Sequence, residues 1–119
     1  MSVKVKSNNA DKYLAQLDDI APVMTNITST AAGSSKIICR EITWTKYGPL
    51  NVISYIFNTN AIVDVGEIIL KLPKASSANF SCGLGDAFGL QITGTTIKNL
   101  NALPAQSWFR GQIIYPSNW

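Results

Sequence analysis

Short apolar segments separated by turn residues constrain the fold of this chain more than any other feature. The chain has 14 isoleucines and 6 valines, and such β-branched side chains pack well on the pleated surface of a sheet. Turn-forming sequences such as Tyr47-Gly48-Pro49 and Asn58-Thr59-Asn60 separate the segments. The pattern predicts strands over 36–46, 50–57, 61–65, 67–72, 80–84, 88–93, 95–100 and 106–115. Short strands at this spacing are typical of an antiparallel β-sandwich, here expected to be jelly-roll-like.

Alternation within two of these segments gives more detail. In 36–46 one face is expected to hold Ile38, Ile42 and Trp44. The segments 88–93 and 95–100 are expected to form a hairpin about Gly94.

Length and composition agree with a single folded domain. The chain has 119 residues and a mass of 12.9 kDa, enough for one hydrophobic core without metals or disulfides. It is 46% hydrophobic but only 14% charged, whereas disordered chains are rich in charge and poor in aliphatic residues. Serine, threonine and asparagine supply the remaining polar surface, with 11, 9 and 10 residues.

The first part of the chain differs from the rest. Apolar residues recur there at spacings of four and three, as on one side of a helix, at Tyr13, Leu17, Ile20, Met24 and Ile27. Pro22 interrupts the series, so we expect a helix over about 10–20 followed by a turn or an extended piece. We therefore divide the chain into an N-terminal arm with a short helical neck, 1–35, and a head domain, 36–119. The apolar seam is either an oligomeric stalk or a helix that packs on its own domain.

The distribution of charge and the search for targeting signals limit the classes of partner that we expect. The net charge is +3, but the basic residues are scattered rather than gathered in a stripe, which argues against nucleic acid as a partner. No apolar run is long enough to span a bilayer, and no apolar stretch follows the lysines near the N-terminus as in a secretory signal. We expect a protein made in the cytoplasm, with no membrane partner. Cys39 and Cys82 stand in unlike contexts and are expected to be free thiols.

No motif for catalysis is found. The chain has no histidine, which removes Ser-His-Asp and Cys-His catalysis. Three of the seven acids, Asp64, Glu67 and Asp86, could meet in the fold, but the sequence does not indicate a cleft between them. The glycine-rich stretch 83–89 lacks the Lys-Ser/Thr pair of a phosphate loop. We expect no enzyme, no cofactor and no metal site.

Aromatic and polar residues near loops are compatible with sugar binding. Sugars stack on aromatic faces, while amide, carboxyl and guanidinium groups bind their hydroxyls. The candidate residues for stacking are Trp44, Tyr47, Trp108 and Trp119, with Asp86, Asn99 and Arg110 as polar partners. The alternative that Trp44 and Trp108 fill the core stays open.

Four short elements follow one another within residues 42–115. They are Trp44-Thr45-Lys46-Tyr47-Gly48, then Asn51-Val52-Ile53-Ser54, then 65–73 with its Ile-Leu-x-Leu-Pro step, and finally Ser107-Trp108-Phe109-Arg110 and the residues to Pro116. In this order and spacing they resemble the C-terminal head domains of receptor-binding proteins from tails and baseplates of tailed phages of Gram-positive bacteria. The resemblance implies a homotrimer with a helical neck before the head, and saccharide binding in clefts on or between heads. It transfers no binding residue, because receptor contacts vary in these proteins. The chain departs from many of them in being short, with Pro22 in the neck and no evident shoulder domain.

The expected function is therefore that of a phage or prophage tail-tip protein. It would bind cell-wall polysaccharide or teichoic acid, assemble with other tail proteins in the bacterial cytoplasm, and act in the virion. Two alternatives remain: a structural tail adaptor or decoration subunit without a ligand, and a monomeric carbohydrate-binding module.

Overall fold

The structure is a computed structural model, and it describes residues 22–84 and 88–118. These residues form eight strands and no helix: β1 (Val23–Asn26), β2 (Ile37–Tyr47), β3 (Leu50–Thr59), β4 (Ile68–Lys71), β5 (Phe80–Leu84), β6 (Phe88–Thr93), β7 (Thr96–Asn99) and β8 (Trp108–Pro116). The all-β prediction is confirmed. The helix expected over 10–20 lies outside the described residues.

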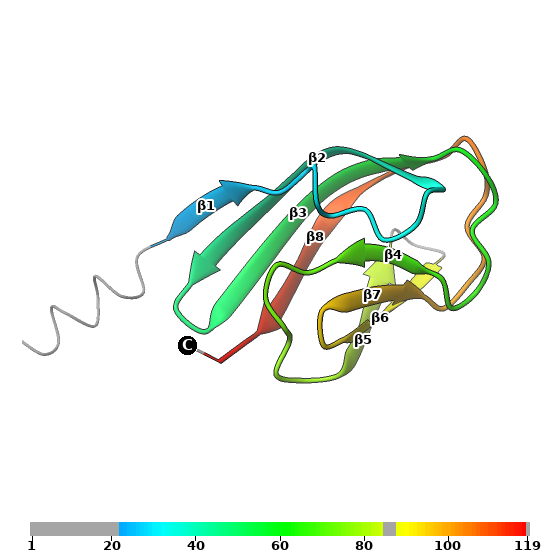
Figure 1. Ribbon diagram of the computed structural model, residues 1–119. Helices are drawn as coiled ribbons and strands as arrows, with labels where there is room; N and C mark the ends of the chain where they lie inside the picture. The colour runs from blue at the N-terminus through cyan, green and yellow to red at the C-terminus, as the bar shows by residue number, and fades with distance from the viewer. Residues whose placement is uncertain (1–21, 85–87, 119) are drawn as a thin grey trace, which may run out of the picture.

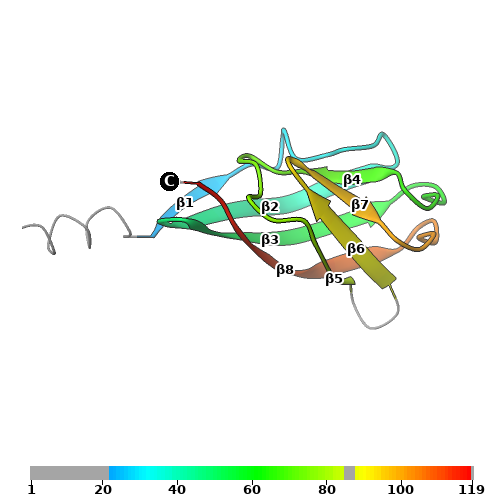
Figure 2. The same cartoon turned by 90° about the horizontal axis from the view of Figure 1, so that it is seen from below.

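The strands form two antiparallel sheets that pack as two layers (Figures 1 and 2). Sheet A has the order β1-β2-β3-β8, and sheet B has the order β4-β7-β6-β5. In sheet B, β5, β6 and β7 are neighbours both in the sequence and in the sheet. Strand β4, which precedes them in the sequence, lies beside β7, so the four strands have an arrangement of the Greek-key type. The architecture is therefore sandwich-like.

The core lies between the two sheets, because alternate residues of each strand face the opposite layer. Sheet A contributes Ile42, Ile53, Tyr55, Phe57 and Ile113, and sheet B contributes Leu70, Leu84, Leu90, Ile92 and Ile97. Phe57 and Phe109 stack within this core, with ring centroids 5.4 Å apart.

A bulge in β2 changes which residues face the core. Arg40 has no partner on β3, because the pairing passes from Cys39 opposite Phe57 to Glu41 opposite Ile56. The extra residue shifts the alternation by one position. The prediction that Ile38 shares the face of Ile42 and Trp44 is wrong for that reason. Ile37 and Cys39 face inward in its place.

The segment 22–35, which was assigned to the arm, is part of both layers. Strand β1 pairs with β2, from Val23 opposite Lys46 to Asn26 opposite Thr43. The chain then reaches sheet B, where Lys71 N donates to Ala31 O at 2.8 Å and Gly33 N donates to Ile69 O at 3.1 Å. A Cβ on Gly33 would lie 2.6 Å from the carbonyl oxygen of Ile68, so only glycine allows this approach. The head domain thus begins before residue 36.

The strand expected over 61–65 does not form. Within it Val63 makes an isolated bridge to Leu103 and is fully buried. The predicted hairpin 88–100 does form, with Gly94 at a φ of 56° in its turn.

One end of sheet A projects beyond sheet B (Figures 1 and 2). Here β1 begins, β2 turns into β3, and the C-terminal residues return, with Ser117 N donating to Pro49 O at 2.7 Å. We call this the projecting end.

No helix among the described residues is long and apolar enough to cross a membrane.

Candidate functional site

The outer face of sheet A, which points away from sheet B, is the most distinctive surface of the described residues. The register of β2, β3 and β8 arranges its side chains in rows across the strands. From the end opposite the projecting end, the rows are Ile38–Asn58–Trp108, Glu41–Ile56–Arg110, Thr43–Ser54–Gln112, Thr45–Val52–Ile114 and Tyr47–Leu50–Pro116. The character of the face changes along these rows from polar to apolar.

Trp108 begins the polar part of the face, and 56% of its surface is exposed. The guanidinium of Arg40 lies 5.3 Å from the centre of its ring, a distance at which a cation is attracted to the π-face. Arg40 Nε also donates a hydrogen bond of 2.7 Å to Asn58 Oδ1. Because Arg40 is the bulge residue of β2, the bulge places this cation beside Trp108.

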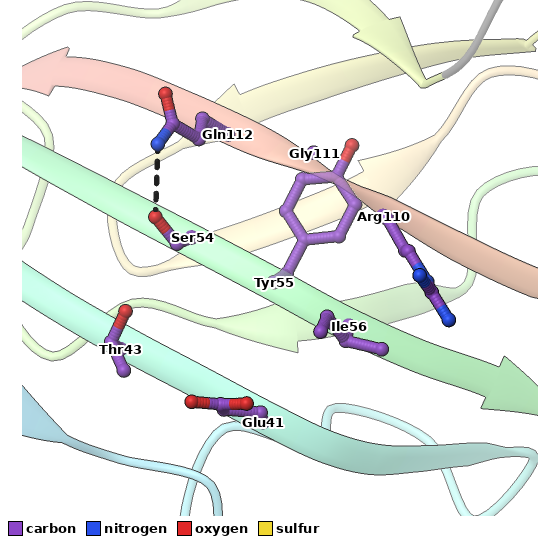
Figure 3. Close-up of a pocket in the computed structure, with 8 residues that line it drawn as sticks. All are labelled: Glu41, Thr43, Ser54, Tyr55, Ile56, Arg110, Gly111 and Gln112. Carbon is purple, nitrogen blue, oxygen red and sulfur yellow. Dashed lines mark hydrogen bonds between the residues drawn. The ribbon is translucent and has the colours of Figure 1, made fainter.

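Next to Trp108 is a shallow depression of about 330 Å³. Figure 3 shows its lining by three neighbouring strands: Glu41 and Thr43 from β2, Ser54, Tyr55 and Ile56 from β3, and Arg110, Gly111 and Gln112 from β8. Gln112 Nε2 donates to Ser54 Oγ at 3.2 Å. Glu41 and Arg110 stand on either side of Ile56, two strand spacings or about 10 Å apart.

This part of the face can bind a ligand rich in hydroxyl groups. Arg110 offers several N–H donors, Glu41 accepts, and the hydroxyl and amide groups of Thr43, Ser54 and Gln112 do both. Trp108 supplies an aromatic surface for stacking. These groups are already held side by side on a sheet, so little conformational entropy is lost when a ligand binds.

The far part of the face is apolar. Four of its side chains are strongly exposed, with exposed fractions of 72% for Met24, 59% for Ile114, 49% for Leu50 and 43% for Tyr47. They come from β1, β2, β3 and β8 at the projecting end, and Val52 lies among them. We call these five residues the apolar end. Contiguous exposed apolar surface commonly marks a contact with another molecule.

The predicted sugar-binding residues divide between this face and the interior. Trp108 and Arg110 are adjacent on it, whereas Tyr47 is four rows away, about 27 Å along the strands. Trp44 faces inward, and its Nε1 donates to Asn51 Oδ1 at 2.8 Å. Asn99 is fully buried, with its amide donating to Val63 O and Asn101 O. Asp86 and Trp119 lie outside the described residues.

The two residues of the predicted apolar seam that the structure describes, Met24 and Ile27, do not share a surface. Tyr13, Leu17 and Ile20 lie outside the described residues. Met24 is in β1 and belongs to the apolar end, whereas Ile27 is buried in the core.

Arg40, Glu41, Ser54 and Gln112 were not among the predicted site residues. Alternation along 106–115 places Gln112 and Ile114 on the face of Trp108 and Arg110, so part of the site was readable from the sequence. Arg40 was not readable, because its position depends on the bulge.

Two of the acids considered in the sequence, Asp64 and Glu67, have a lysine as a partner. Lys36 Nζ lies 3.0 Å from Glu67 Oε2 and 3.8 Å from Asp64 Oδ2. The hydrogen bond from Lys36 is the main cause that lowers the pKa of Glu67, and the same bond raises the pKa of Lys36. Both cysteines are free, and burial raises the pKa of each thiol. Residues 22–84 and 88–118 contain no cluster of acids and cysteines suited to a metal ion.

No protein-family model matches the chain, and neither the curated proteins nor the solved structures include a match.

Proposed function

We propose that the protein is a phage or prophage tail or baseplate protein that binds a host cell-surface saccharide and performs no catalysis. The observation that carries the proposal is the exposed Trp108 between Arg40 and the depression formed by Glu41, Ser54, Arg110 and Gln112. An open groove of this kind suits a chain of sugar rings that rests on a surface, rather than a small molecule that must be enclosed. Its two guanidiniums also suit acidic groups on the chain, as in teichoic acid.

The distribution of features along the molecule supports a head attached at one end. The start of β1, the C-terminal residues and the apolar end are all at the projecting end. Trp108 is at the other end of the same face. A homotrimer joined through the projecting end would present three such faces. Three weak contacts to one cell wall would then act together.

The finer description as a jelly-roll-like head is part of this proposal. The Greek-key order of sheet B supports it, since jelly rolls are built from Greek keys. The place of action would be the tail tip of a virion assembled in the bacterial cytoplasm, with other tail proteins as partners.

The test is binding to a panel of purified Gram-positive cell walls by wild type and Trp108→Ala. We expect saturable binding, and a loss of at least about tenfold in affinity for the variant, equal to about 1.4 kcal/mol. The unfolding midpoint should hardly change, since Trp108 is 56% exposed. Ile62→Ala is the matched control, because Ile62 is similarly exposed, at 60%, but lies in the loop after β3. Unchanged binding by Trp108→Ala would exclude this surface as the saccharide site.

A second candidate function is a structural tail adaptor or decoration subunit. The apolar end favours it, because exposed apolar side chains indicate contact with another subunit rather than with sugar. In that case no cell wall would bind saturably, and a partner virion protein would co-purify with the chain. A monomeric carbohydrate-binding module, the remaining alternative, would bind saccharide at a solution mass of 12.9 kDa.

A further inference from the structure

The two edges of sheet A, which are β1 and β8 (Figure 1), carry matching side chains on the outer face. One row of this face runs across all four strands, from Met24 on β1 to Ile114 on β8. The neighbouring row runs from Asn26 on β1 to Gln112 on β8. The first two side chains are apolar, the other two are amides, and all four are exposed. Each edge therefore presents an apolar side chain followed by an amide.

The backbone of β1 has free hydrogen-bonding groups on the side away from β2. Ile27 N donates to Ile42 O at 2.8 Å, and the residues that bond to the partner strand alternate along an antiparallel pair. Residues 25 and 23 therefore bond to β2, whereas Met24 and Asn26 direct their N–H and C=O groups to the edge. Among the described residues, β1 pairs with no strand other than β2.

The same is true of β8 on the side away from β3. Thr59 N donates to Ser107 O at 3.0 Å, so the odd-numbered residues of β8 bond to β3. Gln112 and Ile114 therefore direct their N–H and C=O groups outward. In the described part of the chain no second strand pairs with β8. An edge with free backbone groups is a template for the addition of another strand.

The two amide side chains are complementary as well. Asn26 Oδ1 accepts from Thr28 N at 3.0 Å and from Thr28 Oγ1 at 2.7 Å, so the Asn26 Nδ2 group remains as a donor. Gln112 Nε2 donates to Ser54 Oγ at 3.2 Å (Figure 3), so Gln112 Oε1 remains as an acceptor. An Asn26 amide placed beside Gln112 can therefore donate to it.

The directions of the strands allow the two edges to pair between copies. Each neighbouring pair in sheet A is antiparallel, so β1 and β8 run in opposite directions. With the rows of two copies in line, Met24 lies opposite Ile114 and Asn26 lies opposite Gln112, and the free backbone groups of each pair face one another. We propose that β1 of one copy adds to β8 of a second copy in this register, so that sheet A continues from one chain into the next.

This contact joins two different surfaces of the same protein. Such contacts repeat from copy to copy until a ring closes, whereas a two-fold contact produces pairs. The inference therefore rests on the proposed homotrimer, to which it assigns the contacting strands, and it does not depend on saccharide binding. It also brings two exposed apolar residues of the apolar end, Met24 and Ile114, against each other.

Disulfide formation between two variants tests the register. Met24→Cys and Ile114→Cys chains are refolded together and oxidised, and the joined peptides are identified by mass spectrometry. Opposed residues of hydrogen-bonded antiparallel pairs have Cα atoms about 5.5 Å apart, a separation that a disulfide spans. We expect a disulfide between positions 24 and 114 of different chains. Ile62→Cys, at an exposed loop residue, replaces Met24→Cys in the control and should give at least about tenfold less product with Ile114→Cys.

Each other outcome overturns the proposal in a defined way. Disulfides that join two positions 24 or two positions 114 would replace the proposed contact with a two-fold one. Equal yields with Met24→Cys and Ile62→Cys would show random collision. Absence of the disulfide in a protein with the solution mass of three chains would place the trimer contact elsewhere. Absence at the mass of one chain, 12.9 kDa, would exclude the homotrimer together with the strand pairing, while cell-wall binding by the same sample tests the saccharide site separately.

Discussion

Asn51 is the residue that ties the projecting end together. Its Oδ1 accepts from Trp44 Nε1 at 2.8 Å, and its amide donates to Ser117 Oγ at 2.7 Å and to Tyr115 O at 3.3 Å. It is fully buried, so water cannot replace these partners if the side chain is lost. One asparagine therefore holds β2, β3 and the C-terminal residues in place where sheet B does not cover them.

Asn51→Ala is expected to destabilise the protein by about 2 kcal/mol, because it removes the buried bonds of the Asn51 amide and leaves the partly buried indole N–H of Trp44 without its acceptor. Urea denaturation followed by tryptophan fluorescence measures the change. Asn60→Ala is the matched control, since Asn60 is exposed and its side chain makes one bond, to Ser35 O at 3.1 Å. We expect it to cost well under about 1 kcal/mol. Equal costs for the two variants would contradict the role of Asn51.

At the scale of the element, the bulge lets β2 contribute side chains to the core and also place the cation of Arg40 beside Trp108 on the outer face. On either side of Arg40 the pairing of β2 with β3 is continuous, and alternate residues of β2 face the core both before and after the bulge. The extra residue therefore adds a guanidinium to the outer face without disturbing the core. Deletion of Arg40 and deletion of any other residue of β2 should therefore have very different effects on folding.

Deletion of Arg40 should leave a regular strand, because Cys39 and Glu41 already face consecutive residues of β3, Phe57 and Ile56. We expect a folded protein whose stability changes by no more than about 1 kcal/mol, and whose saccharide binding is weakened. Deletion of Thr43 is the control, since it turns half of the strand inside out and should abolish folding. Circular dichroism and thermal unfolding distinguish the two. A deletion of Arg40 that unfolds the chain would show that the bulge itself is required.

The sequence predicted elements better than faces. Turn residues and β-branched segments placed β2 to β8 within two residues at each end, because strand existence depends on local chemistry. Which face each side chain occupies depends on register, and a bulge is not visible in the local pattern. Trp44 and Trp108 show the consequence: both are strand tryptophans, yet one bonds to buried Asn51 and the other is exposed. The strand predicted at 61–65 failed because Val63 is buried by a single bridge rather than by a ladder.

At the scale of the whole molecule, an ion pair links Lys36, the residue before β2 of sheet A, to Glu67, the residue before β4 of sheet B. The pKa of Glu67 is lowered from its usual value of 4.5, and that of Lys36 is raised from 10.5, in each case mainly by their hydrogen bond. The lowered carboxyl pKa gives stability above about pH 4.5 that is lost as pH falls through the folded-state pKa. The raised lysine pKa gives stability below about pH 10.5 that is lost as pH rises through its folded-state value.

Glu67→Gln should therefore lower stability between these limits and make a smaller difference at about pH 3. Urea denaturation of wild type and variant at about pH 7 and pH 3 measures this. The effect should be small, because the pair is accessible to solvent. Glu41→Gln, at a carboxylate without an ion pair among the described residues, is the matched control for the loss of one carboxylate. A Glu67→Gln cost that persists at pH 3 would assign the effect to packing instead.

At the same scale, we expect the apolar end to carry the subunit contacts of the proposed homotrimer. Met24, Leu50 and Ile114 expose their side chains on one continuous surface, which favours burial against another subunit. Light scattering on a sizing column should give three chains of 12.9 kDa, 38.7 kDa in all. Ile114→Asp would place a charge in the interface and should shift the mass to 12.9 kDa, whereas Ile62→Asp, at an exposed loop residue, should keep the trimer.

Each other result of the mass measurement has a defined meaning. A wild-type mass of 12.9 kDa would exclude the homotrimer and favour the monomeric module. A trimer that survives Ile114→Asp would place the subunit contacts away from the apolar end, and the apolar seam of the N-terminal segment would become the next region to test. A trimer lost with Ile114→Asp but kept with Trp108→Ala would separate the two ends of one face, one for assembly and the other for the ligand. That separation is what a head with a binding surface far from its attachment requires.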